Sequence, residues 1–116
     1  MGHQTLTDNT TGSSNTAVGV SSLHKNTVGI LNTALGSTTL HNNTTGSRNT
    51  ATGYLSLEVN TEGNLNTATG YQSLQNNTTG DNNTAVGTES LKSNTTGKYN
   101  TGLGYQAGDI ITTGSN

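Results

Sequence analysis

The chain is a tandem array of one seventeen-residue repeat, and this period constrains its fold more than any other feature. Each complete repeat begins at an asparagine, which we number position 1, and no insertion or deletion interrupts the array. The consensus is N-T-A-x-G-x-x-S-L-x-x-N-T-T-G-x-x. We therefore treat residues 1–116 as one repeat array, made of a partial repeat at 1–14 and complete repeats at 15–31, 32–48, 49–65, 66–82, 83–99 and 100–116.

Two columns of this array hold residues that we expect to stack along the molecule as structural ladders. Position 1 is always asparagine, and position 9 is leucine in every repeat except the last: Asn15, Asn32, Asn49, Asn66, Asn83 and Asn100, with Leu23, Leu40, Leu57, Leu74 and Leu91. Every Asp, Glu, Lys and Arg lies at position 7, 10, 11, 14, 16 or 17. Because burial of an unpaired charge is costly, the charge-free positions form the interior, an interface or a tight turn.

The composition of the repeat indicates strands and turns rather than helices. The two glycines in every repeat disfavour a helix, whereas Thr, Val, Ile and Tyr favour strands. The period is too short for two helices or a propeller blade, but it suits one coil of a β-solenoid. We predict an all-β fold, a parallel β-solenoid (β-roll) of about seven coils. Each coil should have one strand over positions 1 to 6 and another over about positions 10 to 14.

Such a coil has few bulky apolar side chains, which suggests that the rod associates with other copies. Hydrophobic residues make up 26% of the chain, and Trp, Phe and Cys are absent. Asparagine ladders and lateral packing are two ways to offset the entropy of ordering the chain. Apolar residues at positions 4 and 6 form a candidate lateral interface: Val18, Leu35, Tyr54, Tyr71, Val86 and Tyr105. We expect a homo-oligomer, with a trimer favoured. The ends lack strong caps, so an end-to-end filament or an excerpt of a longer array are alternatives.

Several classes of function find no support in the sequence. The four Lys and Arg residues are scattered, so no basic patch for nucleic acid is present. No apolar run approaches the ~20 residues of a membrane span, so we expect no membrane insertion. No nucleophile, base and acid set stands out, and we expect neither an enzyme nor a cofactor. His24 and His41 share position 10, but no third metal ligand is evident, which favours a solvated, variable column.

Two threonine columns and a set of sequons leave further possibilities open. Positions 2 and 13 are unbroken threonine files, and such files on a solenoid can order water and bind ice. Against this, position 4 alternates between aliphatic residues and threonine. The N-T-rich repeat also generates Asn-x-Thr sequons by chance, and glycan decoration stays open: Asn9, Asn42, Asn43, Asn76, Asn77, Asn82 and Asn94.

The segments NTAVG at 15–19, NTALG at 32–36, NTATGY at 49–54 and NTAVG at 83–87 resemble the head repeats of trimeric autotransporter adhesins. They also resemble repeats of phage tail fibres and large bacterial surface proteins. The adhesin resemblance implies a left-handed parallel β-roll with three rolls around one axis, although the adhesin coil is shorter than the repeat of this chain. We expect a structural or adhesive fibre segment of an extracellular, cell-surface or virion protein. A host glycan or receptor is a candidate ligand, and an ice-binding or self-polymerising solenoid is the alternative.

Overall fold

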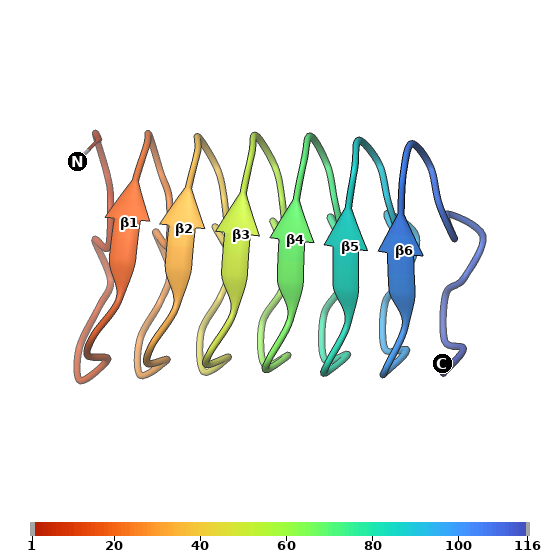
Figure 1. The fold of residues 1–116 in the computed structure, drawn as a ribbon. Helices are drawn as coiled ribbons and strands as arrows, with labels where there is room; N and C mark the ends of the chain where they lie inside the picture. Colours follow the sequence, from red (N-terminus) through yellow and green to blue (C-terminus); the bar gives the residue numbers. More distant parts are fainter. Residues whose placement is uncertain (1, 116) are drawn as a thin grey trace.

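The computed structural model describes residues 2–115 and shows an all-β parallel β-solenoid (Figure 1). Each complete repeat contributes one three-residue strand, and the strands lie side by side in chain order. Every strand pairs in parallel with the equivalent strand of the next repeat. The rod measures 34 × 20 × 16 Å. The strands are β1 (Thr16–Val18), β2 (Thr33–Leu35), β3 (Thr50–Thr52), β4 (Thr67–Thr69), β5 (Thr84–Val86) and β6 (Thr101–Leu103).

The strands are shorter and fewer than the sequence predicts. Each strand covers positions 2 to 4 rather than 1 to 6, and positions 10 to 14 form no strand in the described residues. Five full turns connect β1 to β6, so the estimate of about seven coils is slightly high. One cause is position 5, where glycines with φ between 114° and 137° turn the chain directly after each strand.

The second expected strand is replaced by converging hydrogen bonds around position 13. The backbone N–H groups of Thr27, Val28 and Gly29 all donate to the carbonyl oxygen of Thr44, at 3.1, 3.1 and 3.2 Å. A strand would instead distribute its bonds over alternate residues of its neighbour. The chain therefore curls around one carbonyl of the next coil, and the coil closes within a single repeat.

The interior combines a narrow apolar column with a larger polar set. Each central strand buries its alanine at position 3, and leucine at position 9 packs beside it with no exposed surface. Fifteen polar residues are also buried, against ten hydrophobic ones. Because buried polar groups must be paired, hydrogen bonds along the stack are as necessary to this fold as apolar packing.

Candidate functional site

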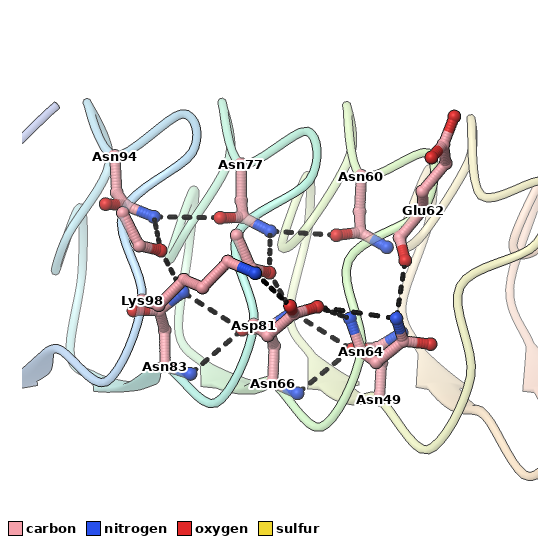
Figure 2. Close-up of polar contacts among 12 residues, drawn as sticks. Asn49, Asn60, Glu62, Asn64, Asn66, Asn77, Asp81, Asn83, Asn94 and Lys98 are labelled. Carbon is pink, nitrogen blue, oxygen red and sulfur yellow. Dashed lines mark hydrogen bonds and ion pairs between the residues drawn. The ribbon is translucent and has the colours of Figure 1, made fainter. Parts of the chain in front are cut away.

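Asparagine side chains at position 1 bond adjacent coils together along the rod (Figure 2). The backbone N–H of Asn66 donates to Oδ1 of Asn49 at 3.0 Å, and Nδ2 of Asn66 donates to the carbonyl oxygen of Gly80 at 2.8 Å. The same two bonds recur for the other interior members of the column. Five of the six asparagines at this position are buried, and Asn15 at the first coil is half-buried.

A second asparagine ladder runs parallel to the first at position 12. Nδ2 of Asn77 donates to Oδ1 of Asn60 at 2.8 Å and to the carbonyl oxygen of Gly80 at 3.0 Å. Gly80 O thus accepts from both ladders and joins them. A Cβ at Gly80 would collide with Asn77 Oδ1 and with the carbonyl oxygen of Gly97, which explains the invariant glycine at position 15.

The two threonine columns differ in what their hydroxyl groups do. At position 13 each hydroxyl donates to the next coil, as when Thr44 Oγ1 donates to the carbonyl oxygen of Thr61 at 3.0 Å. At position 2 the threonines lie on the outer face of the strands, beside a buried alanine. Among the described residues, none of these position-2 hydroxyls has a hydrogen-bond partner within the chain. They are Thr16, Thr33, Thr50, Thr67, Thr84 and Thr101.

Position 16 also carries a ladder, which the sequence reasoning missed because the column is variable. Ser47 N–H donates to Asn64 Oδ1, and Asn64 N–H donates to Asp81 Oδ1, both at 2.9 Å. Lys98 Nζ then donates to Asp81 Oδ2 at 2.8 Å (Figure 2). The signal in the sequence was the recurrence of short side chains with an oxygen acceptor at this position.

The electrostatics of this ladder centre on Asp81. Burial raises the pKa of Asp81, but hydrogen bonds from Lys98 and Asn64 and the charge of Lys98 together bring that pKa below its ordinary value of 3.8. The same ion pair raises the pKa of Lys98 above its ordinary value. Both groups therefore hold their charges more firmly than free side chains do.

The residues expected at a lateral interface all lie on the surface of the described rod. Their exposed fractions run from 36% to 72%. The rings of Tyr54 and Tyr71 stack on adjacent coils with centroids 5.9 Å apart. All six side chains are exposed, and position 4 ends each strand while position 6 follows the turn at position 5: Val18, Leu35, Tyr54, Tyr71, Val86 and Tyr105.

The two histidines at position 10 lie on adjacent coils. His24 and His41 stack with centroids 5.1 Å apart, and each Nδ1 lies 3.1 Å from a backbone carbonyl oxygen. Residues 2–115 contain no group of three His, Cys, Asp or Glu side chains suited to a metal. No pocket is found among the same residues.

The sequon asparagines differ in exposure, and Asn42 is half-buried with its Nδ2 donating to the carbonyl oxygen of Glu58. Asn43, Asn77 and Asn94 are buried members of the position-12 ladder, and their amide groups already bond to neighbouring coils. Asn76 and Asn82 are exposed. Only the exposed asparagines present a side-chain amide to an external enzyme.

Two further findings bear on class and family. No helix in residues 2–115 is long and apolar enough to cross a membrane. The chain matches no protein-family model, no curated protein and no solved structure.

Proposed function

We propose that this protein is a rigid structural segment of a fibre, located outside the cell, on the cell surface or on a virion. The observation that carries the proposal is the continuity of the axial ladders. Hydrogen bonds at positions 1, 12 and 13 connect the coils of the described chain along the rod. A molecule built in this way transmits load and sets a distance, and it needs no concave site.

The proposal includes self-association through positions 4 and 6. Leu35 and Val86 project from the outer strand face, and the stacked Tyr54 and Tyr71 extend the apolar surface beyond the strand ends. Apolar side chains that are exposed on neighbouring coils favour burial against a partner. A homotrimer would bury them around a common axis, and the resemblance to trimeric adhesin heads favours that number.

Sedimentation velocity and native mass measurements test this association. We expect the wild-type chain to form a defined small oligomer. Tyr71→Lys should shift it toward monomer, because it places a charge in the candidate lateral interface. The matched control is Asn76→Lys, at an exposed site in the same repeat but outside the candidate lateral interface. A wild-type chain that stays monomeric at high concentration contradicts self-association, and open-ended polymers favour end-to-end stacking instead.

An adhesive role would rest on the same rod. The strict repeat brings equivalent surface positions into register along the rod, and tyrosine recurs at position 6, which suits multivalent contact with a repetitive ligand such as a host glycan. Binding of the chain to an array of glycans, compared with binding of Tyr54→Ser, tests this part of the proposal. We expect weak binding that depends on the exposed tyrosines. Absence of glycan binding would leave the chain a spacer rather than an adhesin.

A further inference from the structure

The outer face of the six strands presents a regular array of hydroxyl and methyl groups. Positions 2 and 4 point outward on either side of the buried position 3 in every strand. Position 2 is threonine throughout, and position 4 is Val, Leu or Thr. We call these two columns the strand face; its members at position 4 are Val18, Leu35, Thr52, Thr69, Val86 and Leu103.

The spacing of the strand face is set by the backbone. Strands paired in parallel register repeat every ~4.8 Å across the sheet, and positions 2 and 4 are about 6.7 Å apart along each strand. Every pairing between β1 and β6 keeps the same register, so the array has no offset along its length. Figure 1 shows the six arrows side by side with their directions aligned.

The threonine hydroxyls at position 2 are available to water. None of them bonds within the described chain, in contrast to the position-13 hydroxyls, which donate to carbonyl groups. No charged residue occurs at positions 2 to 4 of any repeat. Such a face offers water hydroxyl partners at fixed intervals, with methyl groups beside them.

We propose that the strand face binds ice. Rows of water anchored at a two-dimensional spacing set by the sheet can join the oxygen lattice of an ice surface, whose repeats are of similar size. A second copy is a poorer occupant for the position-2 file, because an apolar partner would leave six buried hydroxyls without hydrogen bonds. Ice binding and burial of position 4 between copies are competing uses of the same strand face, because a partner that covers position 4 removes the second column of the array.

The experiment measures thermal hysteresis and inhibition of ice recrystallisation by the whole chain. The test variant is Thr67→Lys, on the strand face, and the matched control is Thr79→Lys, an exposed threonine of the same repeat at position 14. We expect wild type and Thr79→Lys to be active, and Thr67→Lys to lose most of the activity. Thr67→Tyr, a neutral strand-forming substitution, serves as a second test that does not depend on a new charge.

Circular dichroism establishes that each variant is folded before its activity is compared. The proposal is overturned if the wild-type chain shows neither activity at its highest soluble concentration. It is also overturned if folded Thr67→Lys and Thr67→Tyr keep full activity, or if Thr79→Lys loses as much as they do. The sedimentation behaviour of Tyr71→Lys is measured separately, so failure of ice binding is distinguishable from failure of the fibre proposal.

Discussion

At the scale of single residues, the coil closes through backbone conformations that most side chains disfavour. Positions 7, 9 and 17 adopt left-handed conformations, with φ between 48° and 61° in the non-glycine residues. Each such residue costs roughly 1–2 kcal/mol, and asparagine tolerates the conformation better than leucine does. The cost recurs in every coil because the turn geometry recurs.

Leu65→Asn should therefore stabilise the protein. Leu65 is half exposed at φ 57°, and Asn82 already occupies the equivalent position one repeat later. We expect a gain of about 0.5–1 kcal/mol in the free energy of unfolding, measured by chemical denaturation. Leu35→Asn is the control, because Leu35 lies in β2 with ordinary strand backbone. If Leu35→Asn also raised the free energy of unfolding, the gain in Leu65→Asn would come from surface polarity and not from backbone conformation.

Ser56 and Ser73 occupy the same position in adjacent repeats but differ in hydrogen bonding. Ser56 Oγ is buried without a partner, whereas Ser73 Oγ donates to the carbonyl oxygen of Ala85 at 3.0 Å. We expect Ser56→Ala to raise stability by up to ~1 kcal/mol and Ser73→Ala to lower it by about 1 kcal/mol. Thermal unfolding of the two variants checks this difference, and equal effects would contradict it.

Asp81 should make stability depend on pH. Its folded-state pKa lies below the ordinary 3.8, so its contribution is present above that value and is lost as pH falls through the folded pKa. Asp81→Asn keeps an oxygen acceptor for the N–H of Asn64 but removes the charge that pairs with Lys98. The stability difference between wild type and this variant should therefore shrink on acidification below about pH 4. Asp8→Asn, at an exposed site in another repeat, is the control for the loss of one negative charge.

At the scale of the repeated element, a coil is held by columns rather than by its own contacts. Asn60 Nδ2 donates to Asn43 Oδ1 at 2.8 Å, and Asn60 Oδ1 accepts from Asn77 at 2.8 Å. Asn60→Ala would leave groups on both neighbours short of a partner in a buried site. We expect a loss of about 3 kcal/mol or more in unfolding free energy.

The control for Asn60→Ala is Asn9→Ala, the same change at the first asparagine of the position-12 ladder. Asn9 is exposed and bonds to only one neighbouring coil, through Asn26. Asn9→Ala should therefore cost clearly less, because water replaces the lost bond. Denaturant titration of both variants measures the difference, and similar losses would show that the ladder does not act along its length.

The same columns explain which parts of the coil could be predicted. The charge-free columns at positions 1 and 9 were expected to stack as ladders, and the structure buries them. Position 2 has the same pattern in the sequence but lies on the outer face. The second strand was predicted wrongly because threonine, which recurs at positions 13 and 14, suits both a strand and the observed curl around the carbonyl group at position 13. The position-16 ladder was missed because serine, asparagine and aspartate serve as acceptors interchangeably.

At the scale of the whole molecule, stability is a sum over coils and the interfaces between them. Deletion of residues 49–65 removes one complete repeat and brings Arg48 next to Asn66 in the original phase. Ser47 N–H then meets Asp81 Oδ1 in place of Asn64 Oδ1. We expect a folded rod that is shorter by ~4.8 Å, as measured by small-angle scattering.

Deletion of residues 49–64 is the control, because it leaves one extra residue and shifts the columns by one position. Leu74 would then no longer lie in register with Leu40, and both asparagine ladders would break. We expect loss of cooperative unfolding in circular dichroism. If both deletions fold equally well, strict register is not required and the ladder account of this fold is wrong.

The sequence by itself determined the period and the parallel in-register stacking, and it restricted the buried columns to the charge-free positions. These follow from one-dimensional regularity, because equal spacing brings like residues together and burial excludes charge. Only the tertiary structure decided how each coil closes and what each hydroxyl does. Threonine files at positions 2 and 13 look alike in the sequence. The curl at position 13 directs its hydroxyls to the next coil, while the short strand directs those at position 2 toward solvent.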